Sequence, residues 1–206
     1  MFHPVPPFTR ALILVTVAMF AIQEFIGDAM LLYLALWPFG SSAVLGGGYG
    51  FQPWQVITYG FLHGSVLHLF FNMFALYMFG SDLERLFGPA RYLNLYFVSV
   101  IIAAVTQLVF SAVAGGEPYP TVGASGGVFG ILLAFGMYFP NRRVVLLIPP
   151  IPMPAWVFVL LYGVVELYLG VTGTQAGVAH FAHLGGMLGA GLLIQHWRGR
   201  FPFRRR

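Results

Sequence analysis

A serine and a histidine, each among small residues, stand at the starts of two apolar segments. Ser125 lies within Gly123-Ala124-Ser125-Gly126-Gly127, and His183 lies within Ala182-His183-Leu184-Gly185-Gly186. Glycines let the backbone turn sharply, and free N–H groups at a helix start can face a developing oxyanion. A hydroxyl beside a neutral imidazole forms a nucleophile and its general base. The pair predicts acyl-transfer chemistry, although a glycine-serine pair at a helix start is also typical of a cap.

A second histidine and an asparagine have a spacing that suits oxyanion binding. His68 and Asn72 are four residues apart and so share one face of a helix. Both side chains can donate hydrogen bonds to an oxyanion alongside the backbone N–H of Ser125. The structural alternative is hydrogen bonding between helices, which is common for His and Asn in membranes. His63 falls off this face, and we expect it to hold the preceding loop.

The elements that position these residues are apolar helices. Of the 206 residues, 59% are hydrophobic and 8% are charged, and the mean hydropathy is +0.83. A soluble domain carries roughly 25% charged residues, so the composition excludes soluble enzymes, nucleic-acid-binding proteins and disordered proteins. We predict an all-α, polytopic membrane protein with six transmembrane helices. The expected spans are about 11–37, 62–81, 92–113, 125–139, 155–171 and 181–196.

The basic residues predict the orientation of these spans. All ten are arginines, and they fall before the first span, between the second and third, between the fourth and fifth, or after the sixth. The positive-inside rule therefore predicts a single membrane domain over 1–206, with a cytoplasmic N-terminus (1–10) and a basic cytoplasmic tail (197–206). The tail is expected to contact anionic lipid rather than nucleic acid. The chain contains no cysteine, which excludes thiol nucleophiles and cysteine-ligated metals.

The fourth expected span is short, which predicts a submerged site. The 15 residues from Ser125 to Phe139 span about 22 Å, whereas the hydrocarbon core is about 30 Å thick. Arginines follow this span, so Ser125 is expected roughly 8 Å below the outer surface. Small residues on the fourth and sixth spans predict close helix packing that brings His183 within reach of Ser125. They are Gly126, Gly130, Gly186 and Ala190.

These motifs together resemble the rhomboid family of intramembrane serine proteases in its six-helix bacterial form. The motifs are His68 with Asn72 in the second span, Gly123-Ala124-Ser125-Gly126 opening the fourth, and Ala182-His183-x-x-Gly186 opening the sixth. Their order, the span number and the orientation also match, over about residues 51–190. The resemblance implies a rhomboid-like bundle and an endopeptidase that cleaves transmembrane helices near the outer membrane surface.

The resemblance also implies roles for individual residues. Ser125 would be the nucleophile and His183 the base, in a dyad without a third acidic member. His68, Asn72 and the Ser125 backbone N–H would stabilise the oxyanion. Phe129 stands where many members have a tyrosine stacked on the catalytic imidazole. Residues expected to support the site are Gly123, Ala124, Gly126, Phe129 and Gly186.

The implied partners are transmembrane protein substrates and the lipid bilayer of a bacterial inner membrane, with no cofactor, metal or nucleic acid. The sequence departs from the family pattern at Trp54-Gln55, where members often carry Trp-Arg, and at Ala190, where a second glycine is usual. Glu84 and Gly88 match a structural E-x-x-x-G pattern. His180, three residues before His183, is a second candidate base, but it lacks a glycine three residues later and is expected in the loop above the site.

Three other functions are compatible with parts of the sequence. A metal site could use histidines on the outer side, namely His63, His68, His180 and His183, with Glu117 as the nearest outer acid. A transporter could use the acids within spans, Glu24, Asp28 and Glu166, for which the sequence assigns no role. No inverted repeat supports a transporter. A non-catalytic relative could bind membrane helices, but retention of both Ser125 and His183 argues against it.

Overall fold

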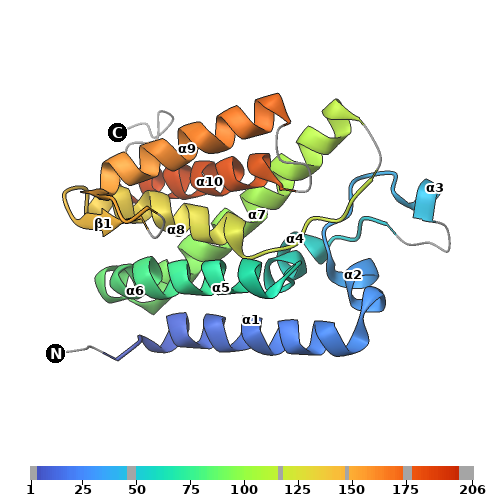
Figure 1. The fold of residues 1–206 in the computed structure, drawn as a ribbon, viewed down its shortest axis with the longest axis horizontal. Coiled ribbons are helices and arrows are strands. Elements are labelled where there is room, and N and C mark those ends of the chain that lie inside the picture. Colours follow the sequence, from blue (N-terminus) through green and yellow to red (C-terminus); the bar gives the residue numbers. More distant parts are fainter. Residues whose placement is uncertain (1–3, 46–49, 116–117, 147–148, 174–177, 200–206) are drawn as a thin grey trace.

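The computed structural model describes residues 4–45, 50–115, 118–146, 149–173 and 178–199. Helices dominate it, with a single small hairpin (Figure 1). The elements are α1 (Pro7–Ile26), α2 (Asp28–Leu34), α3 (Ser42–Leu45), α4 (Gln55–Thr58), η1 (Tyr59–Phe61), α5 (Val66–Ala75), η2 (Leu76–Gly80), α6 (Ser81–Phe87), α7 (Pro89–Ala114), α8 (Ser125–Tyr138), β1 (Arg143–Val145), β2 (Pro152–Pro154), α9 (Ala155–Thr172) and α10 (His180–Trp197). Glu117 and the tail beyond residue 199 lie outside the described residues.

The described helices confirm the predicted all-α membrane fold. Four of them are long and apolar enough to cross a bilayer: α1, the continuous run from α5 to α6, α7 and α9. The 14-residue α8 and the 18-residue α10 complete the bundle. The exterior suits lipid, since Phe25 and Val113 are 97% and 83% exposed. Thus the hydrophobic surface is spread around the helices, as a bilayer requires.

Three expected boundaries are wrong, and one of them is the end of the second span, which continues to Phe87 rather than ending near Ser81. The first span ends at Ile26 rather than near residue 37, because Gly27 adopts a φ of 71° and breaks the helix before α2. Such a positive φ is readily available only to glycine. The second span begins at Val66 rather than Leu62, where the Ser65 hydroxyl accepts the His68 backbone N–H as an N-cap. Residues 62–65 therefore form a loop above the second span.

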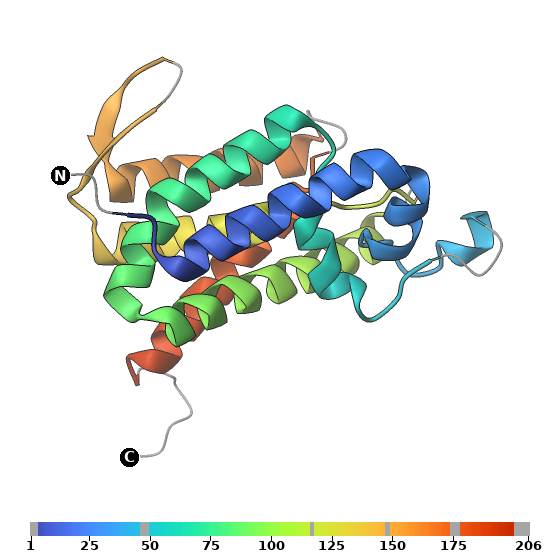
Figure 2. The same ribbon diagram turned by 90° about the horizontal axis from the view of Figure 1, so that it is seen from below.

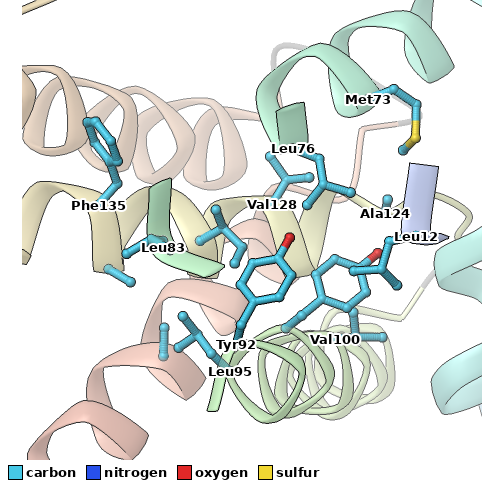
Figure 3. Packing of buried hydrophobic residues seen from close by; sticks show 14 of the residues in the cluster. Leu12, Met73, Leu76, Leu83, Tyr92, Leu95, Val100, Ala124, Val128 and Phe135 are labelled. Atoms are coloured by element: carbon cyan, nitrogen blue, oxygen red, sulfur yellow. The ribbon is translucent and has the colours of Figure 1, made fainter. Parts of the chain in front are cut away.

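The buried core lies where α7, α8 and the α5–α6 run meet (Figure 3). Leu76, Leu83, Tyr92 and Leu95 are fully buried there, and Val128 of α8 packs beside them. Seen from below, α1 lies on the outside of the bundle between the α5–α6 run and α7 (Figure 2), and it packs against the α5–α6 run. The central helices α7, α8 and α10 therefore form the structural support for the site residues.

Glu84 joins the peripheral helix α1 to α6. Its carboxylate accepts the backbone N–H groups of Phe8 and Thr9 at 3.0 and 2.6 Å and the Thr9 hydroxyl at 2.7 Å. The first N–H groups of a helix lack partners within the helix and favour a negative charge nearby. Gly88 ends α6 with a φ of 73°, so α7 can begin at Pro89. The E-x-x-x-G pattern therefore has a structural role, as expected.

Gln55 holds together the long segment between α2 and α5 that contains α4. The side chain is fully buried, and its oxygen accepts the N–H groups of Trp37 and Gln52 at 3.2 and 3.1 Å. Its amide nitrogen donates to the carbonyls of Tyr33 and Gly50 at 3.3 and 3.2 Å. A neutral amide here makes four bonds at the position where family members often carry arginine. The segment is thus held by one satisfied polar side chain.

Candidate active site

The site is centred on a direct contact between Ser125 and His183. Ser125 is the first residue of α8, and His183 lies in the first turn of α10. The Ser125 Oγ lies 2.8 Å from the His183 Nε2. This is hydrogen-bond distance for a hydroxyl and a basic imidazole nitrogen. Two residues that are 58 positions apart in sequence therefore form a potential nucleophile–base pair.

Glycines allow this contact by letting α8 and α10 approach closely. A Cβ at Gly186 would lie 1.9 Å from the Gly126 carbonyl oxygen. A Cβ at Gly130 would lie 2.0 Å from the Ser99 hydroxyl of α7 and 3.0 Å from the Gly186 carbonyl oxygen. Neither position can hold a side chain without moving backbone or a buried residue. The small faces predicted on these spans do face each other in the structure.

Gly123 shapes the backbone and the space next to Ser125. Its φ of 131° is strained for other residues, and a Cβ there would lie 2.8 Å from the His68 ring and 3.5 Å from the Ser125 Oγ. The Gly123 N–H donates to the Tyr59 carbonyl at 3.0 Å. Glycine is therefore needed twice, for the turn and for the space between the His68 imidazole and the Ser125 hydroxyl.

The aromatic ring of Phe129 sets the plane of the histidine. The two ring centroids are 4.4 Å apart and the rings are 5° from parallel. Phe129 lies one turn after Ser125 on α8, so the helix that presents the hydroxyl also supplies the surface against which the imidazole rests. Phe129 therefore stacks on the imidazole at the position expected for a tyrosine, but it lacks the tyrosine hydroxyl.

His68 and Asn72 lie on α5 at one edge of the site. The His68 ring borders the space beside Ser125, as the Gly123 geometry requires. The Asn72 side chain is buried, and its amide donates to the His68 carbonyl at 2.9 Å. The structure therefore brings His68 beside the hydroxyl, whereas the Asn72 amide is bonded to its own helix. An amide nitrogen has two hydrogens, so Asn72 retains a second donor.

His63 supports the backbone before Ser125. It is fully buried in the loop between η1 and α5, and its backbone N–H and carbonyl both bond the side chain of Gln23. Burial, reinforced by the nearby His68, lowers the pKa of His63 to about 3. The neutral ring can accept the Ala124 N–H, which lies 3.5 Å from its Nε2. The expected structural role of His63 agrees with these contacts.

The structure adds Glu166 and His180 to the surroundings of His183. The Glu166 Oε2 on α9 lies 2.8 Å from the His183 Nδ1 and 2.7 Å from the His180 Nδ1. His180 opens α10 and is 5% exposed, so its expected place in a loop above the site is wrong. The expected absence of an acidic neighbour also fails. Signals were present in the sequence: two histidines share a helix face, and an acid within a span needs a partner.

Glu166, His180 and His183 lie close enough together to suggest a metal site. Their ligand atoms lie within 4.8 Å of one another. Tetrahedral zinc with bond lengths of about 2.0–2.1 Å separates neighbouring ligand atoms by about 3.3 Å. The Glu166 oxygen is instead 2.7 and 2.8 Å from the two nitrogens, the distances of direct hydrogen bonds. The observed distances therefore fit direct hydrogen bonds between these groups better than shared binding of a metal ion.

Comparisons of the chain with a family profile and with known proteins point to the same family. A family profile described as the rhomboid domain matches residues 50–199. Rhomboid protein 1, mitochondrial, from Saccharomyces cerevisiae is 32% identical over 139 residues, covering 65% of this chain and 39% of that protein. Rhomboid protease GluP from Bacillus subtilis is 30% identical over 138 residues, covering 66% of this chain and 24% of that protein.

A third relative aligns over more of the chain. Rhomboid protease GlpG from Yersinia pestis is 27% identical over 197 residues, covering 94% of this chain and 63% of that protein. The chain thus spans less than two thirds of the length of each of these three relatives. The residues matched by the family profile include both helices that carry the Ser125–His183 pair.

Proposed function

Because the chain belongs to the rhomboid family, we propose that it is an intramembrane serine endopeptidase that uses Ser125 and His183. The observation that carries this proposal is the 2.8 Å contact between the Ser125 Oγ and the His183 Nε2 at the starts of two apolar helices. A serine alcohol is a poor nucleophile until a base removes its proton. The proposed substrates are transmembrane helices of membrane proteins.

The acylation step follows from this geometry. The His183 Nε2 takes the Ser125 proton while the Oγ forms a bond to the substrate carbonyl carbon, and the carbonyl oxygen becomes an oxyanion. The oxyanion then collapses, the peptide C–N bond breaks, and the Nε2–H gives its proton to the leaving amine. Water repeats the sequence on the acyl-enzyme and restores the Ser125 hydroxyl.

His68, Asn72 and the Ser125 backbone N–H are the proposed oxyanion donors. The supporting observation is that the His68 ring and the Ser125 Oγ border the same small space beside Gly123. The Ser125 N–H is at the start of α8, where backbone donors are free of helical partners. Donors fixed in advance stabilise the developing charge without reorganisation.

The proposed cleavage position is near the outer membrane surface. The described arginines lie on α1, on α6, at the start of α7, beside the hairpin and after α10, and these meet at one end of the bundle (Figure 1). The positive-inside rule assigns that end to the cytoplasm, in a bacterial inner membrane. Helix α8 begins part-way along the bundle, short of the far end of α7 (Figure 1). This supports a site submerged below the outer surface.

Helix α9 is the proposed gate for substrate and water. Only Ala155, Phe158, Val159 and Glu166 of its 18 residues are buried. Proline residues precede it in the hairpin, including Pro152 and Pro154. The light packing of α9 supports lateral opening on the side facing the lipid, which is a common way for an enzyme to admit substrate.

The decisive experiment is cleavage of a tagged single-pass helix in liposomes by the wild type and by Ser125→Ala, with and without EDTA. We expect cleavage by the wild type alone, unaffected by EDTA. A fluorophosphonate that labels the wild type but not Ser125→Ala would support the same conclusion. Cleavage that EDTA abolishes would point to metal catalysis instead. A wild type that is neither active nor labelled would favour a relative that binds membrane helices without cutting them.

A further inference from the structure

We infer that Glu166 is a positioning residue that completes a Ser125–His183–Glu166 triad and is itself held by His180. This inference rests on the proposed function, because it concerns how His183 becomes a base. Glu166 lies on α9, and its Oε2 is within hydrogen-bond distance of the Nδ1 atoms of both histidines, at 2.8 Å for His183 and 2.7 Å for His180. The three side chains are 5–12% exposed.

The charge of Glu166 fixes where the protons must lie. An ionised carboxylate only accepts hydrogen bonds, so both Nδ1 atoms donate to it. Neutral His183 therefore carries its proton on Nδ1, and its Nε2 presents a lone pair to the Ser125 hydroxyl 2.8 Å away. This is the tautomer that a base requires. The reverse tautomer would place a proton between Nε2 and the hydroxyl and would prevent proton transfer.

Hydrogen bonds from the two histidines hold the Glu166 carboxylate. Among the described residues, the ion-pair partners of Glu166 are His180 and His183. A buried carboxylate is costly unless it is hydrogen-bonded and paired. When His183 takes the serine proton, the resulting imidazolium lies directly against Glu166. The pair is therefore arranged to stabilise the charged state that forms during the reaction.

Helix packing brings the carboxylate to this position. Gly163, Glu166 and Gly170 follow one face of α9 at helical spacing. A Cβ at Gly170 would lie 3.1 Å from the His180 Cβ, and a Cβ at Gly163 would lie 3.6 Å from Met187. Glycines on either side of Glu166 thus let α9 approach α10 closely. The His183 ring is then fixed by Phe129 on its face and by Glu166 at its Nδ1 edge.

The test measures catalysis by purified full-length variants in liposomes. Glu166→Gln keeps the shape but adds an N–H that can donate to Nδ1 and favour the wrong tautomer. We expect it to lower kcat roughly 100- to 10,000-fold, with KM changed less than about threefold. The rate of fluorophosphonate labelling of Ser125 should fall in parallel, since this probe needs no helix substrate. Glu166→Asp should restore a measurable part of both rates because it restores the carboxylate.

Two further variants separate positioning from stability. His180→Ala removes the group that holds Glu166, and we expect it to lower kcat on the order of 10-fold. Gln107→Leu is the matched control: it removes another buried polar side chain, on α7, which bonds Ser111 and Tyr119 outside the site. We expect it to lower the unfolding temperature in detergent without changing the labelling rate per folded molecule.

Several outcomes would overturn the inference. They are a Glu166→Gln enzyme with kcat within about threefold of the wild type, a loss explained wholly by its folded fraction, or a Glu166→Asp enzyme no better than Glu166→Gln. Bound zinc that is lost in Glu166→Gln, with EDTA inhibition of the wild type, would make the three residues metal ligands. Failure of the proposed function gives a different result, because the wild type and Ser125→Ala would then behave alike.

Discussion

At the scale of single residues, the site combines the proposed nucleophile–base pair with neighbours that restrict the orientation of the imidazole. The Ser125 hydroxyl faces the His183 Nε2, and the Phe129 ring and the Glu166 carboxylate hold the imidazole from two directions. An imidazole held in one orientation loses little conformational freedom when the transition state forms. The roles of Ser125 and His183 are therefore expected to depend on each other rather than to add.

Combined substitution of the pair tests this dependence. Ser125→Ala and His183→Ala should each reduce kcat to the background of the empty site, and the double variant should be no slower than either. Residues that act as one unit show such strong non-additivity. The measurement is single-turnover cleavage of the tagged helix. Two separate losses that multiply in the double variant would contradict a shared role.

Asn72 is expected to contribute less than the pair. If it donates one bond to the oxyanion, Asn72→Ala should lower kcat on the order of 10- to 1000-fold and leave KM nearly unchanged. The same assay measures it, and Gln107→Leu again provides a control for general loss of stability. Rates equal to the wild type would remove Asn72 from the oxyanion site and leave it a structural role on α5, where it bonds the His68 carbonyl.

The buried His63 makes stability depend on pH. Its pKa is about 3 when folded and 6.5 as a reference, so between these values the unfolded chain binds more protons. Stability should therefore fall as the pH drops below about 6.5, by roughly 2.5 kcal/mol between about pH 7 and about pH 4.5. Unfolding in detergent micelles measures this, and His63→Gln should flatten the dependence. Equal slopes for the variant and the wild type would contradict it.

At the scale of elements, helices α7, α8 and α10 form the rigid part and α9 the lightly packed part. The glycine contacts between α8 and α10 leave no space for side chains, and Ser99 of α7 closes against Gly130. Helix α9 buries few residues and contacts the second span through the ring pair of Phe79 and Phe158, whose centroids are 6.0 Å apart. Motion is therefore expected at α9 rather than at the helices carrying Ser125 and His183.

A covalent link between the second span and α9 tests this expectation. The chain has no cysteine, so Phe79→Cys with Phe158→Cys gives one defined pair for a flexible thiol cross-linker. Cross-linking should reduce cleavage of the helix substrate at least about tenfold, while fluorophosphonate labelling of Ser125 continues because the site itself is unchanged. The uncross-linked double variant is the control. Full cleavage after cross-linking would count against α9 as the gate.

At the scale of the whole molecule, the short α8 places a polar site inside a bundle with a lipid-facing exterior. Its 14 residues span about 21 Å, less than the roughly 30 Å of a hydrocarbon core. Non-helical backbone at such depth is tolerated only when protein or water surrounds it. Here Gly123 and Ala124 are buried, with bonds to Tyr59 and His63. Under the proposed function, we expect a substrate helix to unwind locally to reach this position.

Substrate sequence should therefore affect cleavage strongly. Glycine and proline disfavour a helix by about 1 and 3 kcal/mol, so placing them near the cut should raise kcat/KM roughly 5- to 100-fold over a poly-leucine helix of equal length. A panel of single-pass substrates in liposomes measures this. Insertion of each substrate must be verified, because these residues also weaken membrane partition. Equal cleavage across the panel would argue against unwinding as the limiting step.

The sequence by itself determined the membrane fold, the helix order and the residues that could react. Composition and arginine placement need no tertiary information, since a bilayer constrains them directly. Glycine spacing predicted the approach of α8 and α10, because small residues are what such packing requires. The end of the first helix at Gly27 was not predicted, because the sequence stays apolar beyond it. Hydropathy carries no information about the backbone φ at which a helix ends.

Only the tertiary structure decided which polar residues meet. Glu166, His180 and His183 are up to 17 positions apart, and α9 brings the acid to the histidines through a glycine-lined face that no local pattern specifies. Gln55 likewise has four partners spread over Tyr33 to Gln52. Hydrogen-bond partners depend on distances of a few tenths of an ångström between separate segments. Residue type and spacing identify candidates for such bonds, and packing selects among them.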